Sequence, residues 1–108
     1  MSDALARLRL DYRSAFVGYL FRRGETQLNS AYEIGRTAIL AGVGLLDLVQ
    51  VHNGLALEAM RSAPDGEERL DVATAAAAFL VEVLASFEMT QRGFLDSARA
   101  RNGGPDET

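Results

Sequence analysis

Cysteine is absent from the chain, which excludes disulfides, thiolate catalysis and cysteine-ligated metal sites. Lysine is also absent, so every basic residue other than the single histidine is an arginine. The formal net charge is −4, whereas phosphate binding requires a clustered basic excess. We therefore expect neither a thiol enzyme nor a protein whose main partner is a nucleic acid.

Membrane and export signals are also missing. No stretch reaches the roughly 18 uninterrupted apolar residues of a membrane span. The opening residues, MSDALARLRLDYR, mix charges with leucine and lack the pattern of a signal peptide. A chain of 108 residues suffices for one domain with one modest core. We expect a soluble, cytoplasmic protein without a membrane partner.

What the chain does contain is apolar residues at helical spacing, with no strand alternation. Glycine and proline mark the boundaries of four predicted helices: about Leu5 to Gly24, Glu25 to Gly42, Leu45 to Arg61 and Glu67 to Ala100. Short connections between them predict an all-α four-helix bundle with a long C-terminal helix. We expect a single domain over residues 1–101 and a disordered tail over residues 102–108.

Glycines inside the predicted helices need a reason, since each costs about 1 kcal/mol relative to alanine. These residues are Gly18, Gly35, Gly54 and Gly93. Close packing against a neighbouring helix is the compensation that we predict for them.

The fourth helix is more apolar than one core requires. About half of its circumference is taken by Val72, Ala73, Ala76, Phe79, Leu80, Val83, Leu84, Phe87 and Phe94, which is wider than a roughly 100° core stripe. Ala78, Val81, Ala85 and Met89 lie on the opposite side. This excess predicts that a second subunit, a partner protein or both cover part of the helix. High helix propensity of an alanine-rich segment is the alternative reading.

Signals of chemistry are weak. His52 is the only histidine, and no nucleophile arrangement can be argued from it. A di-metal bundle needs Glu-x-x-His pairs from two helices, and no glutamate stands three residues before His52. We interpret His52 as structural and predict no enzymatic activity, metal or cofactor. The basic first helix, with Arg7, Arg9, Arg13, Arg22 and Arg23, suits an acidic partner but is better explained as a solvated face.

Three segments carry a resemblance to a known family: LNSAYEIGRTAI (28–39), LLDLVQVHNGLALEAM (45–60) and FLVEVLASFEM (79–89). Over roughly residues 5–95 the chain resembles the N-terminal domain of RsbU-type serine phosphatases. The resemblance implies a homodimeric four-helix bundle, related to the dimerising domain of the clock protein KaiA. It also implies docking of an RsbT-type serine kinase, or a related signalling protein, in the partner-switching pathway that releases a stress sigma factor.

The partner-binding surface of that family lies on the start of the second helix and the middle of the fourth. Carried over, it falls on Glu25, Asn29, Val81 and Ala85. Glu25 matches the family residue and Val81 is a conservative change, whereas Asn29 and Ala85 replace bulkier apolar groups. Ala78 and Met89 flank Val81 at helical spacing and complete the predicted surface.

The leading hypothesis is therefore a non-catalytic docking and dimerisation module, either free-standing or the regulatory part of a longer protein. No phosphatase domain follows the resembling segment, so we expect no dephosphorylation by this chain. Two alternatives stay open: a small-ligand or cofactor-binding sensory bundle, with His52 and the tyrosines facing a cavity, and a coiled-coil spacer.

Overall fold

Four helices account for nearly all of the described chain, as the sequence predicts. The structure, a computed structural model, describes residues 3–103 and the side chains of residues 3–100. The helices are α1 (Asp3–Arg22), α2 (Glu25–Leu40), α3 (Leu45–Ser62) and α4 (Gly66–Gly103), and no strand occurs among the described residues. The predicted all-α bundle is confirmed. The predicted tail, residues 102–108, lies outside the described residues except for its first two, which continue α4.

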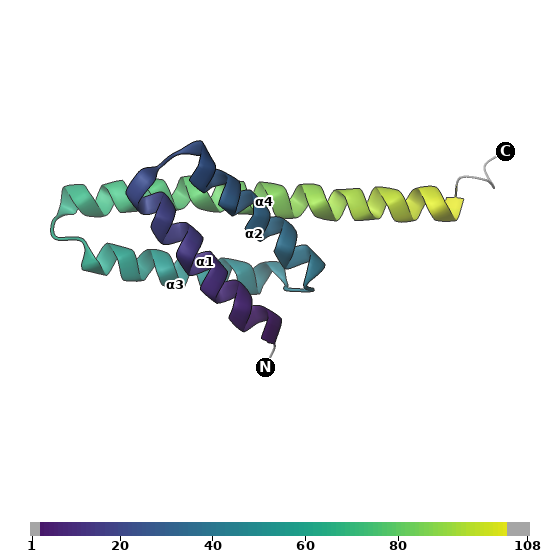
Figure 1. The fold of residues 1–108 in the computed structure, drawn as a ribbon, viewed down its shortest axis with the longest axis horizontal. Coiled ribbons are helices and arrows are strands. Elements are labelled where there is room, and N and C mark those ends of the chain that lie inside the picture. The colour runs from purple at the N-terminus through teal and green to yellow at the C-terminus, as the bar shows by residue number, and fades with distance from the viewer. Residues whose placement is uncertain (1–2, 104–108) are drawn as a thin grey trace.

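The helices are arranged around α4, which is much the longest (Figure 1). α3 and α4 run antiparallel, and α1 and α2 cross on one side of this pair (Figure 1). α4 continues past the other three helices, and every side chain from Gln91 to Ser97 is exposed. Phe94 was predicted to face the core. That prediction is wrong, because the bundle ends before α4 reaches this residue, and Phe94 is 51% exposed.

The turn between α1 and α2 differs from the expected glycine stop. The residue with the left-handed backbone is Arg23, at φ 54°, whereas Gly24 is extended and caps the start of α2. Side-chain contacts hold Arg23 in this unfavourable conformation. Its Nε donates to the carbonyl of Leu20 at 3.0 Å, and its Nη2 donates to Asp71 at 2.8 Å. The guanidinium also lowers the pKa of the Asp71 carboxyl.

α2 and α4 approach closely at Gly35. A Cβ built on this glycine would overlap the Ser86 hydroxyl and the Val83 carbonyl oxygen and would lie 2.8 Å from the Phe87 nitrogen. The buried Ser86 hydroxyl donates to the carbonyl of Tyr32 at 2.5 Å. The predicted close packing is therefore correct for Gly35. It is wrong for Gly18, Gly54 and Gly93, whose Cβ positions have no neighbour within 4 Å among the described residues.

An aromatic cluster fills the centre of the bundle. Phe79 of α4 meets Tyr12, Phe16 and Tyr19 of α1 at centroid distances of 5.4 to 5.7 Å. His52 of α3 is 3% exposed and stacks edge-on against the rings of Tyr12 and Phe16. The cluster joins three of the four helices and is the core around which α1 and α3 close on α4.

A single hydrogen bond satisfies the polar atoms that face each other in this cluster. The Tyr12 hydroxyl lies 2.6 Å from Nδ1 of His52. Burial raises the pKa of Tyr12 and lowers the pKa of His52, so both groups are neutral near pH 7. The tyrosine hydroxyl then donates and the imidazole nitrogen accepts. The structure therefore places His52 in the core, in agreement with its interpretation as a structural residue.

We expect Gly35→Ala to lower the free energy of unfolding by about 1 to 3 kcal/mol, because the methyl group overpacks the contact between α2 and α4. Gly54→Ala is the matched control, since it is another glycine within a helix but has open space around its Cβ. It should raise stability by up to about 1 kcal/mol through helix propensity. Urea denaturation of both variants checks this prediction. Equal stability of the two variants would contradict the close approach.

We expect stability to fall as the pH drops below 6.5, the ordinary histidine value. The unfolded chain binds a proton at His52 in this range, whereas the folded chain resists it until the pH reaches its lowered pKa. The stabilisation from keeping His52 neutral is fully present above pH 6.5. Below that pH it falls by up to about 1.4 kcal/mol per pH unit. Urea denaturation at pH 7.5 and pH 5.5, compared with His52→Gln, isolates this effect. A parallel decline in the variant would mean that other groups cause it.

Candidate docking surface

The outer face of α4 is apolar and faces solvent in this single chain. Val81 is 66% exposed and Met89 is 58% exposed. Ala78 and Ala85, one turn before and after Val81, are exposed as well. On the other side of the same helix Phe79 and Val83 are completely buried. The structure therefore agrees with the helical-wheel assignment, and the residues that the structure describes leave most of the surface of Val81 and Met89 uncovered.

The start of α2 lies alongside this part of α4. Glu25 and Asn29 are exposed, and both line a shallow groove together with Leu28, Tyr32 and Glu82. Glu82 belongs to α4 and immediately follows Val81. Two segments separated by about fifty residues in sequence therefore meet at one surface. The contact at Gly35, further along α2, fixes their relative position.

We call the set Glu25, Asn29, Ala78, Val81, Ala85 and Met89 the α2–α4 surface. Its centre is apolar and its border carries charge. Glu25 and Glu82 contribute two carboxylates at the groove, and Glu88 forms an exposed ion pair with Arg92 at 2.9 Å one turn further along α4. No arginine lines the groove itself. The arrangement suits a partner with an apolar anchor and a basic border.

Further apolar side chains are exposed outside the α2–α4 surface, and the sequence analysis did not predict their exposure. Leu40, Leu45 and Leu46 are exposed around the turn between α2 and α3, and Phe94 and Leu95 are exposed on the extension of α4. No local signal in the sequence distinguishes these residues, because Val51 and His52 are also adjacent on a helix and both are buried.

The cavity expected by the ligand-binding alternative is not where that alternative placed it. His52 and Tyr12 are buried against one another, and Tyr19 is buried against Phe79. Only Tyr32 is half-buried, and it lines the shallow groove with Glu25 and Asn29. Among residues 3–103 no group of three or more histidine, aspartate and glutamate side chains is placed to hold a metal ion. The exposed residues of the α2–α4 surface are suited to contact with another protein, because an apolar centre is surrounded by charged groups.

By length and composition alone, α4 could also cross a membrane. Its most apolar window lies within Gly66–Ala100 and has a mean hydropathy of 1.8, and 39% of that window is buried inside the bundle. The core helix of a soluble protein has the same properties. The apolar character of α4 is therefore weak evidence for a membrane span.

Comparison with known proteins gives one family. The family model described as the N-terminal domain of the phosphoserine phosphatase RsbU matches residues 10–90, three quarters of the chain. No curated protein and no solved structure matches. The matched segment contains most of α1, all of α2 and α3, and the part of α4 that packs in the bundle.

Proposed function

The chain belongs to the family of RsbU N-terminal domains, and from this membership we propose that it docks an RsbT-type serine kinase through the α2–α4 surface. The family implies a regulatory role in a partner-switching pathway, and its N-terminal domain is distinct from the catalytic phosphatase domain. Proteins of this family are typically soluble. The kinase is the partner that the resemblance names for the residues of this surface.

The observation that carries the proposal is the coincidence of two independent arguments at one place. The family resemblance selects Glu25, Asn29, Val81 and Ala85 from positions in the sequence. Independently of the resemblance, the fold leaves the apolar outer face of α4 exposed to solvent. An apolar centre excludes water and gives affinity, and charged neighbours orient the partner. Glu25 and Glu82 at the border would pair with basic groups of the kinase.

We propose in addition that the protein is a homodimer. Support comes from large apolar side chains that face solvent in the single chain, namely Phe94 and Leu95 on the extension of α4 and Leu46 on α3. Neighbouring exposed apolar groups such as Phe94 and Leu95 are typical of an interface. Light scattering after size exclusion should give twice the chain mass of 11.7 kDa. The double change Phe94→Asp with Leu95→Asp should give the single chain mass, and a monomeric parent protein at micromolar concentration would contradict the proposal.

We expect Val81→Asp to weaken binding of the RsbT-type kinase by at least about 2 kcal/mol, because it places a charge in the desolvated centre of the contact. Folding should be retained, since Val81 is mostly exposed. Titration calorimetry with the kinase measures the effect, and circular dichroism checks the fold.

Leu57→Asp is the matched control for this experiment. Leu57 is an exposed apolar residue of α3 and lies outside the α2–α4 surface, so its change should leave kinase binding unaltered. Unchanged affinity in a folded Val81→Asp protein would place the kinase elsewhere. Unfolding of that variant would mean that Val81 contributes to the core.

A further inference from the structure

A groove runs along the seam between α1 and α3 and ends against the first turns of α4, and none of its lining residues belongs to the α2–α4 surface. Three hollows follow one another along it and share lining residues. The first, of about 450 Å³, is lined by Leu5, Arg9, Asp47, Gln50, Val51, Gly54, Leu55, Glu58 and Arg61. The second shares Leu55 and Glu58 with the first, and the third shares Leu20, Ala59 and Ser62 with the second. The hollows therefore adjoin one another end to end, and we call the three together the α1–α3 groove.

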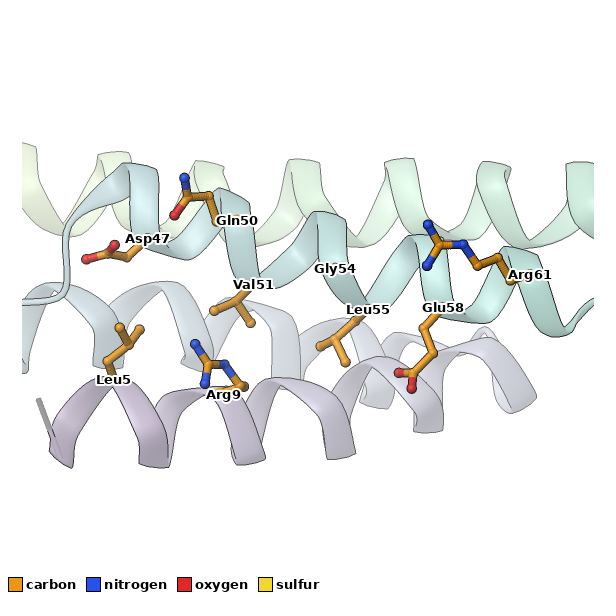
Figure 2. Close-up of a pocket in the computed structure, with 9 residues that line it drawn as sticks. All are labelled: Leu5, Arg9, Asp47, Gln50, Val51, Gly54, Leu55, Glu58 and Arg61. Carbon is orange, nitrogen blue, oxygen red and sulfur yellow. The ribbon is translucent and has the colours of Figure 1, made fainter. Parts of the chain in front are cut away.

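The floor of the groove is apolar. Leu5 of α1 and Val51 and Leu55 of α3 project toward each other between the two helices (Figure 2). Leu20 and Ala59 continue the floor in the later hollows. Gly54 lies in the middle, and a Cβ placed there would have no neighbour within 4 Å. The absence of a side chain at this position leaves room for another backbone to come close to α3.

The two walls of the groove carry opposite charges. The α1 side presents Arg9 and Arg13, followed by Arg23 just after the helix, and the opposite side presents Asp47, Glu58, Glu68 and Asp71. Arg61 is the exception on the acidic side. The protein as a whole has a net charge of −4, whereas α1 carries four arginines and two aspartates. The α1 wall is therefore a basic region on an acidic protein.

Some of these charges already pair across the groove. Arg13 bonds Glu58 at 2.6 Å and Arg23 bonds Asp71 at 2.8 Å, and both pairs are solvent-exposed. The exposed pair of Arg13 and Glu58 contributes little to stability, so a ligand that supplies new partners can replace it at small cost. Arg9 and Asp47, which line the first hollow, have no ion pair among the described residues. These two charges are available at the end of the groove where Gly54 opens the floor.

We propose that the α1–α3 groove binds one amphipathic helix of a partner protein. The apolar face of that helix lies on the floor, an acidic flank faces the arginines of α1, and a basic flank faces the carboxylates of the opposite wall. From Leu5 to Phe21, α1 rises about 24 Å, which is the length of a helix of roughly four turns. A groove of this length with an apolar floor and charged walls fits a helix better than a compact small molecule.

This second contact does not rest on the proposed kinase docking, because the two surfaces have no residue in common. A protein with both surfaces could hold two partners at once, one on the α2–α4 surface and one in the groove. Failure of either contact would leave the other unaffected.

The test uses two synthetic peptides and the isotope-labelled full chain. The first peptide is an amphipathic helix of about 16 residues with leucines on one face, glutamates along one flank and arginines along the other. The second has the same composition, but glutamates and arginines alternate on both flanks. We expect the first to bind at least about fivefold more tightly, because only this peptide meets each wall with the opposite charge. Amide resonances of Val51, Gly54 and Leu55 should shift on binding, and those of Val81 and Met89 should not.

Two variants and one control complete the test. Arg9→Glu makes both walls acidic at the open end and should remove most of the preference for the first peptide. Gly54→Gln fills the floor and should weaken both peptides by about tenfold or more. Arg99→Glu makes the same charge change on the exposed extension of α4 and should leave the affinities unchanged.

Three results would overturn the proposal. The first is equal affinity of the two peptides, or no binding by either. The second is a set of shifted resonances that lies on α2 and the middle of α4 instead of α1, α3 and the first turns of α4. The third is a shift of the groove resonances with protein concentration in the absence of peptide, which would make a second copy of the chain the occupant.

Discussion

The close approach of α2 to α4 at Gly35 is the constraint on which the rest of the structure depends. With no side chain at this position, α2 lies directly against the backbone of α4 at Val83 and Phe87, and Ser86 donates a hydrogen bond back to α2. A rigid helix transmits this contact along its length. Ten residues earlier, the start of α2 is placed beside Glu82, so that Glu25 and Asn29 share a groove with α4. A larger residue at position 35 would separate these two parts of the docking surface.

The aromatic cluster places a second constraint on the bundle. The constraint at Gly35 is steric, whereas the one in the cluster is the direction of a hydrogen bond. Phe79 alone would accept many arrangements of neighbouring apolar side chains. The hydrogen bond between Tyr12 and His52 accepts few, because an unpaired hydroxyl or imidazole in this buried position would lose hydrogen bonds to water without replacement. It therefore fixes α1 relative to α3. That relation also sets the width of the α1–α3 groove, which opens along the same two helices.

Much of this fold could be predicted from the sequence, because local signals determine it. The helix boundaries follow glycine, proline and the apolar period, and they agree with the structure to within about three residues. The exposure of Val81 and burial of Val83 follow from the same period. The misjudged residues depend on tertiary arrangement. Phe94 keeps the core-facing phase, but only the lengths of the other helices reveal that nothing is there to cover it. Gly35 and Gly54 look alike in sequence, and only the course of α2 and α4 distinguishes them.

The docking surface shows the same division between local and tertiary information. The apolar outer face of α4 can be read from the wheel, but its proximity to Glu25 and Asn29 depends on the packing of α2, which no local pattern specifies. The α1–α3 groove escaped sequence analysis for a further reason. Its acidic wall combines Asp47 and Glu58 of α3 with Glu68 and Asp71 in the first turns of α4, so the charges look scattered along the chain. Only folding brings them opposite the arginines of α1. A basic helix that reads as a solvated face in sequence thereby becomes one side of a polarised groove.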